Sequence, residues 1–123
     1  MQREIDRLFA TIALGCDRAQ ISGQAVGMHL SQNAYAFSQY DDQWRFIEDP
    51  AFKPHELPAG ATLAFEAEDQ QLEMPERLSA EPLVTCIASG ELNAFRLTIR
   101  PAGGEGFSMG TDDEGLLRRF PHS

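Results

Sequence analysis

The sequence of 123 residues is long enough for one domain with a single hydrophobic core. Its 42% apolar and 24% charged residues are typical of a folded, soluble chain, and no run approaches the roughly 20 apolar residues that would span a bilayer. The net charge of −9 argues against nonspecific binding to the phosphate backbone of nucleic acids.

The first 22 residues carry the pattern of an amphipathic helix. Apolar side chains recur there at steps of three and four residues, and Ser22-Gly23 supplies the stop signal. No Ser, Thr, Asp or Asn precedes the pattern as a cap for the first turn. The apolar stripe should pack on the rest of the protein, and it consists of Ile5, Leu8, Phe9, Ile12, Cys16 and Ala19.

After Gly23 the pattern changes to short segments of β-formers separated by turn residues. The segments 25–30, 34–39 and 44–47 predict a three-stranded meander. Segment 50–60 contains three prolines and should cross between sheets without regular pairing. Further strands are predicted at 62–68, 71–74, 83–88, 95–100, 107–109 and 116–120.

These elements predict an α+β fold in which the helix packs on an antiparallel sandwich of two sheets. The helix is followed by about eight to ten short strands, with turn signals at the spacing that is typical of sandwiches. Segment 83–88 (LVTCIA) is apolar on both faces and should be a central strand. Segment 95–100 alternates cleanly, with Phe95, Leu97 and Ile99 expected to face the core.

No catalytic, cofactor or metal site is predicted. His29, His55 and His122 are scattered, without a Cys or His partner at ligand spacing. The acidic run 112–115 lacks the alternating oxygens of a calcium loop and should be a solvated turn. The glycines of segment 103–106 are not followed by the Lys and Ser or Thr of a phosphate loop.

The two cysteines leave two interpretations open. Cys16 lies on the helix stripe and Cys86 in the strand predicted to be central. If the helix lies across that sheet, they can form a disulfide that closes a loop of about 70 residues in an oxidising compartment. Otherwise they are two separate buried thiols that behave as small hydrophobes.

Three stretches of the chain resemble one family. They are RLFATIALGCDRAQISGQAVGMHLSQNAYAF, HELPAGATLAF and CIASGELNAFRLTIR, and they cover nearly the whole chain in order. Together they resemble the H-type minor pseudopilins of the type II secretion system, which are related to type IV minor pilins. The positions that carry the Leu-Pro-x-Gly and Ser-Gly-Glu signatures are Leu57, Pro58, Gly60, Ser89, Gly90, Glu91 and Phe95.

The resemblance implies a pilin-like architecture. Residues 1–23 would be the C-terminal half of a stem helix, and residues 24–123 a β-rich head in one structural domain. The helix would continue upstream of Met1 into a hydrophobic segment that the sequence does not contain. That segment would anchor the protein in the bacterial inner membrane, with the head in the periplasm. The two cysteines are not a hallmark of the family.

The resemblance also implies a structural role without catalysis or cofactors. The protein would sit near the tip of the pseudopilus and link a tip complex of other minor pseudopilins to the shaft of major pseudopilins. The isolated domain should be monomeric or weakly associating, because the segment that would drive assembly most strongly is missing. Partners would bind through the sides of the head and through exposed loops, including those at 50–60 and 75–82. The alternative is a minor pilin of a type IV pilus that takes part in DNA uptake or pilus priming, although the net charge of −9 disfavours DNA as a partner.

Overall fold

The computed structural model describes residues 1–120 and begins with one long helix, α1 (Gln2–Ser22). Met1 occupies the N-cap position, and its side chain makes no capping hydrogen bond. Gly23 ends the helix with a φ of 75°, and its N–H donates to the carbonyl oxygen of Ala19 at 2.9 Å. A left-handed residue at this position costs glycine little, so the predicted helix end is confirmed.

Ten strands of the described chain form two antiparallel sheets. Sheet A contains β1 (Val26–Leu30), β2 (Ala34–Asp41), β3 (Gln43–Phe46), β4 (His55–Glu56) and β7 (Val84–Cys86). Sheet B contains β5 (Thr62–Ala67), β6 (Gln70–Leu72), β8 (Arg96–Arg100), β9 (Phe107–Thr111) and β10 (Leu117–Phe120). The strand orders are β3-β2-β1-β7, with β4 beside β2, and β10-β9-β8-β5-β6. The predicted fold class, a helix on two antiparallel sheets, is confirmed.

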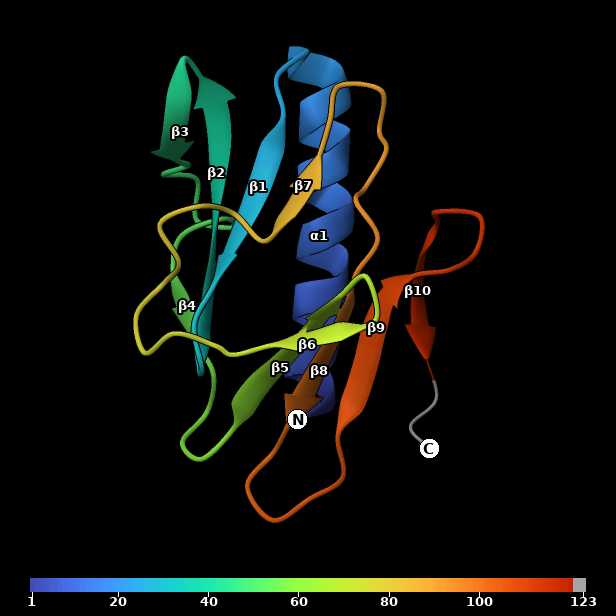
Figure 1. Ribbon diagram of the computed structural model, residues 1–123. Coiled ribbons are helices and arrows are strands. Elements are labelled where there is room, and N and C mark those ends of the chain that lie inside the picture. Colours follow the sequence, from blue (N-terminus) through green and yellow to red (C-terminus); the bar gives the residue numbers. More distant parts are fainter. Residues whose placement is uncertain (121–123) are drawn as a thin grey trace.

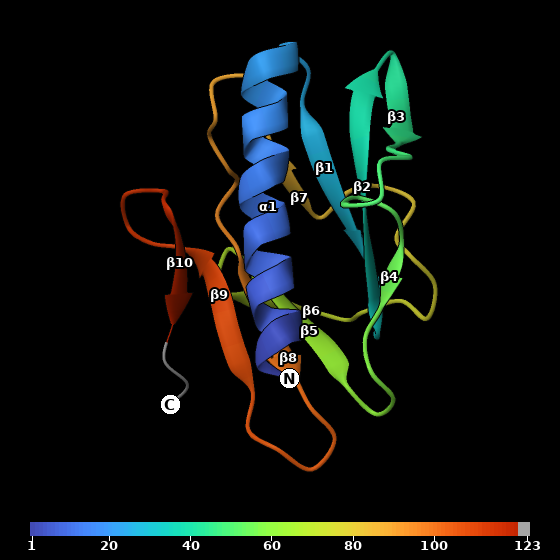
Figure 2. The same ribbon diagram turned by 180° about the vertical axis from the view of Figure 1, so that it is seen from behind.

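Helix α1 runs along both sheets (Figures 1 and 2). Its N-terminal half lies beside sheet B and its C-terminal half beside β1 and β7 of sheet A. One hydrophobic core joins the three layers, because side chains from α1 and from both sheets are buried together. The helix is therefore part of the domain and not a separate arm.

The helix face that meets the sheets includes two residues that apolar periodicity does not mark. Thr11 is buried because its hydroxyl donates to the carbonyl oxygen of Arg7 at 2.7 Å, which satisfies the polar group within the helix. Gly15 is buried where a Cβ atom would lie 3.3 Å from Val26, so the missing side chain lets α1 approach β1 closely. Of the predicted stripe, Ile5, Leu8, Ile12 and Ala19 are buried, while Phe9 and Cys16 are partly buried.

The register of sheet B follows the alternation in the sequence. Leu97 and Ile99 of β8 are fully buried and pair with Phe65 and Leu63 of β5. Arg96 and Arg100 of β8 are exposed. Because successive side chains of a strand point to opposite faces, this alternation was enough to orient β8.

The prediction that segment 83–88 forms a central strand is wrong. Strand β7 covers only Val84–Cys86 and lies at the edge of sheet A. The N–H of Thr85 on its outer side bonds Asn93 instead of another strand. Val84 and Cys86 are buried, but Ile87 beyond them is 46% exposed. The segment is apolar because one face meets α1, not because strands flank it on both sides.

The Pro-rich segment also departs from its prediction. Two residues of segment 50–60 form the short strand β4, in which His55 pairs with Tyr35 and Glu56 with Ala34 of β2. Pro54 and Pro58 flank this pair, so they interrupt the strand without removing an N–H group from it. Proline therefore limits the length of this strand instead of forbidding it.

Candidate functional site

The N-terminal half of α1 is joined to the sheets by two polar contacts of its acidic side chains. Glu4 Oε1 lies 2.7 Å from His55 Nε2 on β4. At the other side of the helix, Arg119 Nη1 of β10 lies 2.6 Å from Asp6 Oδ1, and its guanidinium carbon is 4.7 Å from the centre of the Phe9 ring. The two contacts come from different sheets, so they fix the helix from both sides.

The C-terminal half of α1 is joined to β2 through amide groups. Arg18 Nε donates to Gln39 Oε1 at 3.0 Å, and the Arg18 guanidinium carbon lies 5.7 Å from the centre of the Phe52 ring. The Gln39 amide donates in turn to Ser22 Oγ at 2.9 Å and to Gln24 Oε1 at 2.8 Å. The end of the helix is thus held where the chain turns into β1.

The Leu-Pro-x-Gly signature forms the turn that leads into β5. Leu57 is buried, and its N–H donates to the carbonyl oxygen of Asn33 at 2.8 Å. The carbonyl oxygen of Pro58 accepts from the N–H of Ala61 at 3.0 Å. Gly60 has a φ of 83°, and a Cβ atom there would lie 2.6 Å from the methyl carbon of Ala102. The glycine is needed for both the backbone conformation and the space.

The Ser-Gly-Glu signature forms a second turn, after β7. Gly90 has a φ of 92°, and a Cβ atom there would collide with the side-chain amide of Gln20 on α1. The carbonyl oxygen of Glu91 accepts from the N–H of Ile87 at 3.0 Å, and the carbonyl oxygen of Ser89 accepts from the Gln20 amide at 3.4 Å. The two signature turns lie at opposite ends of the molecule (Figure 1), so they do not build one site.

The last signature position, Phe95, anchors the entry to β8. Its ring is buried and stacks on Phe65, with 6.1 Å between the ring centres. Its N–H donates to Thr111 Oγ1 at 3.1 Å, and its carbonyl oxygen accepts from the N–H of Thr111 at 3.1 Å. The seven signature positions therefore lie in two turns and in the core.

The two cysteines meet between α1 and β7. A disulfide joins Cys16 to Cys86, with 5.3 Å between their Cα atoms and 70 residues between them in the sequence. Cys86 is only 3% exposed. The bond ties α1 to β7, the edge strand of sheet A.

A buried imidazole and hydroxyl also come together on the face of sheet A away from α1. His29 Nε2 lies 2.7 Å from Ser38 Oγ, and His29 Nδ1 lies 2.8 Å from the carbonyl oxygen of Ser79. Burial lowers the pKa of His29, and the hydrogen bond to Ser79 and the charge of Glu81 oppose this shift. Both side chains are at most 1% exposed, so a substrate cannot reach this pair and its role is to hold segment 75–82 on the sheet.

Segment 75–82 is more ordered than a free loop. The N–H of Ser79 donates to the carbonyl oxygen of Leu30, and the N–H of Leu83 to that of Met28, both at 2.9 Å. Pro82 covers Gly27, where a Cβ atom would lie 2.5 Å from the proline ring. The segment therefore lies against β1 as part of the head.

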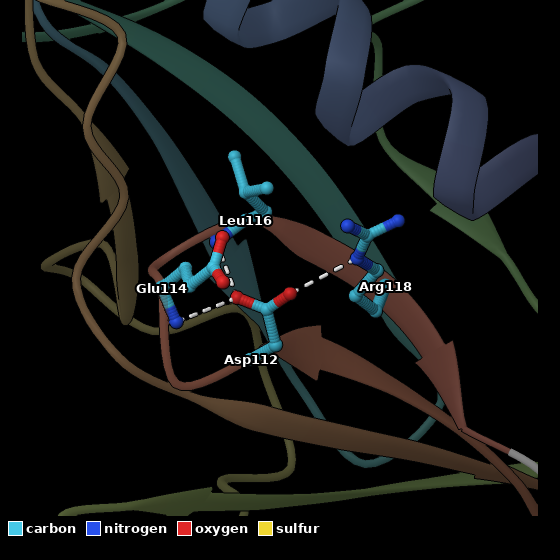
Figure 3. Close-up of polar contacts among 4 residues, drawn as sticks. All are labelled: Asp112, Glu114, Leu116 and Arg118. Atoms are coloured by element: carbon cyan, nitrogen blue, oxygen red, sulfur yellow. Dashed lines mark hydrogen bonds and ion pairs between the residues drawn. The ribbon is translucent and has the colours of Figure 1, made fainter.

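The acidic run 112–115 closes the β9–β10 hairpin (Figure 3). Asp112 Oδ1 accepts from the N–H groups of Glu114 and Leu116, each at 2.9 Å, and Asp112 Oδ2 lies 3.0 Å from Arg118 Nε. These contacts lower the pKa of Asp112, the hydrogen bond from Leu116 most and that from Arg118 next. Within residues 1–120, no three His, Cys, Asp or Glu side chains gather in a way that would hold a metal ion. His122 lies outside the described residues.

The outward side of α1 exposes apolar residues that the sequence analysis did not single out. Leu14 is 46% and Ile21 is 88% exposed. With Phe52 they line a groove of about 420 Å³, which the charged residues Asp17, Arg18 and Asp49 also line. The sequence could have indicated this exposed apolar face, because Leu14 and Ile21 are seven residues apart and therefore lie on one side of the helix, outside the predicted stripe. Of the helices in residues 1–120, none has the length and apolar character to cross a membrane.

Comparison with known proteins tests the resemblance. The chain is 28% identical over 124 aligned residues to "Type II secretion system protein H" of Pseudomonas aeruginosa, an alignment that covers 94% of this chain and 72% of that protein. The chain is similar to this type II secretion system protein H over nearly its whole length. No family model matches the sequence.

Solved structures of minor pseudopilins have the same fold as this chain. The minor pseudopilin EpsH from the type II secretion system of Vibrio cholerae superposes with a TM-score of 0.79 at 22% identity, covering 97% of this chain and 95% of that one. The solution structure of Escherichia coli GspH gives a TM-score of 0.72 at 23% identity, covering 95% and 84%. The long helix followed by two antiparallel sheets is therefore the pilin-like architecture that these proteins share.

Proposed function

We propose that this protein is a minor pseudopilin, a structural subunit near the tip of a type II secretion pseudopilus. It would link a tip complex of other minor pseudopilins to the shaft of major pseudopilins during export of folded proteins across the outer membrane. The observation that carries the proposal is the alignment with type II secretion system protein H over 94% of the chain. The fold shared with EpsH supports it.

The side chains support a structural subunit more than an enzyme. The signature positions build turns and core, and the Ser38–His29 pair is buried. The helix instead offers an outward apolar face at Leu14 and Ile21, which suits packing against a neighbouring subunit. We place the head in the periplasm, with a further helical segment upstream of residue 1 as its anchor in the inner membrane.

Gene deletion in the source bacterium tests this function against the type IV alternative. We expect the deletion strain to retain folded exoproteins in its periplasm, and a plasmid copy of the full-length gene to restore their activity in the medium. Twitching motility and uptake of DNA serve as parallel readouts. Normal secretion combined with lost twitching or lost DNA uptake would reverse the assignment in favour of a type IV minor pilin.

A further inference from the structure

Strand β7 and the turn after it fold back on themselves as a hairpin of residues 84–93, called here the clamped hairpin. The N–H of Thr85 donates to Asn93 Oδ1 at 2.6 Å, and the N–H of Asn93 donates to the carbonyl oxygen of Thr85 at 3.2 Å. Cys86 and Leu92 form an antiparallel bridge across the hairpin. The Asn93 side chain thus occupies the outer edge of β7, where a further strand would otherwise bind.

The clamped hairpin is held to the rest of the molecule from two directions. On one side β7 pairs with β1 over three positions, from Val26 opposite Cys86 to Met28 opposite Val84. On the other side it meets α1, where the hydrogen bond from the Gln20 amide to Ser89 is long, at 3.4 Å. The Cys16–Cys86 bond is therefore the strong connection between the hairpin and the helix.

We propose that the Cys16–Cys86 disulfide is a redox-controlled clamp that fastens hairpin 84–93 to α1 and adds a second covalent connection to the one that the chain itself makes between α1 and β1. Helix α1 also packs on the sheets through the hydrophobic core, but its polar contacts with them are partly exposed and contribute little each, so the disulfide is the strongest single connection between α1 and the hairpin. The clamp rests on the geometry of the two cysteines, whereas the place and time of its closure rest on the proposed periplasmic location of the head.

Closing the clamp is a thiol–disulfide exchange with a protein disulfide as oxidant. The thiolate of one cysteine attacks a sulfur of the oxidant and forms a mixed disulfide, which the second cysteine resolves. The Cys16–Cys86 bond forms, the two electrons pass to the oxidant, and the two protons go to its new thiols. Oxidants of this class work in the periplasm and not in the reducing cytosol, so the clamp closes after export of the head.

The burial of the sulfurs makes the closed clamp resistant to reductants. Cys86 is 3% exposed, and Cys16 is partly covered. The cavity beside the two cysteines is only about 10 Å³ and is lined by apolar groups such as Ile12 and Phe37. A reducing thiolate must therefore approach from the Cys16 side or wait until the hairpin opens, because exchange needs access to a sulfur atom.

Hydrogen exchange and thermal unfolding of the purified protein, with and without reductant, test the clamp. We expect reduction to lower the melting temperature by about 10 °C, since a bond that closes a long loop limits the unfolded chain. Exchange should rise at least tenfold in residues 84–93 and in the last two turns of α1. Strand β8, which lies in the other sheet, provides the internal reference for exchange.

The double variant Cys16→Ser/Cys86→Ala is the matched control, because it has no bond to reduce. It should behave like the reduced protein and should not respond to the reductant. If this variant fails to fold, the unmodified protein can be reduced under native conditions and its thiols alkylated, with a mass measurement to verify complete reduction. This reduced protein is then compared with the oxidised protein. Two alkylated thiols in unreduced protein from the periplasm would overturn the proposal, as would an unchanged melting temperature and exchange pattern after complete reduction.

Discussion

At the scale of single residues, His29 shows how a buried polar group is accommodated in this head. The carbonyl oxygen of Ser79 can only accept, so His29 Nδ1 carries the proton and donates to it. The other nitrogen, Nε2, then accepts from the Ser38 hydroxyl. Both ring nitrogens are satisfied in the neutral form, which is the form that burial favours by lowering the pKa of His29.

This arrangement predicts that the head loses stability in mild acid. Below the ordinary pKa of about 6.5 the unfolded chain binds a proton at His29 that the native state resists, so the free energy of unfolding falls with falling pH. The slope from this group reaches at most about 1.4 kcal/mol per pH unit. Urea unfolding between about pH 5 and pH 8 measures it.

The variant His29→Gln is the control for that series. It removes the titrating group, and its free energy of unfolding should change less between neutral and acid pH than that of the unmodified protein. Equal slopes in the two proteins would contradict the assignment to His29.

At the scale of the elements, the turns decide how the strands enter the sheets. Gly60 needs a left-handed backbone and an empty position beside Ala102, whereas Gly103 needs the left-handed backbone alone. A non-glycine residue in this conformation costs about 1–2 kcal/mol, and a blocked Cβ adds the cost of moving the neighbouring chain. A comparison of substitutions at Gly60 and Gly103 therefore separates the cost of backbone strain from the cost of the blocked Cβ.

We expect Gly60→Ala to destabilise the protein by about 1–3 kcal/mol more than Gly103→Ala does. The φ values are 83° and 68°, so the backbone strain is similar in the two variants. At Gly103 a Cβ atom would meet nothing within 4 Å, which makes it the matched control. Chemical unfolding of both variants measures the difference, and equal losses of stability would show that the contact with Ala102 relaxes without cost.

At the scale of the whole molecule, the exposed apolar side chains are dispersed. They occur on α1, on β2 and β3, on β6 and at the β9–β10 turn, as Ile21, Tyr40, Phe46, Leu72 and Leu116 show. The outer edge of β7, a place where sheets of two molecules often join, is occupied by Asn93. A net charge of −9 adds repulsion between copies.

These features predict that the isolated domain is a monomer at micromolar concentration. Light scattering coupled to size-exclusion chromatography should give a mass near the 13.6 kDa of the chain. The same column run with the heads of other pseudopilins tests for partners under identical conditions. A stable homodimer in the absence of any partner would contradict the prediction.

Local patterns in the sequence were enough to predict much of the architecture. The end of α1 at Gly23 and the orientation of β8 follow from steric preferences and periodicity, which act over a few residues. The turns around Gly60 and Gly90 were recognisable from their signatures. Local rules succeeded here because the interactions that decide these features connect near neighbours in the chain.

Only the tertiary structure decided the features that depend on distant partners. The apolar segment of β7 has the composition of a central strand, yet it is an edge strand that meets α1. Gly15 and Thr11 belong to the buried helix face because of what lies opposite them and within the turn, not because they are apolar. The meeting of Cys16 with Cys86 likewise needs the helix to lie across that edge. The amino-acid pattern predicts which side chains are buried, but the packing of the helix on the sheets determines which buried side chains contact each other.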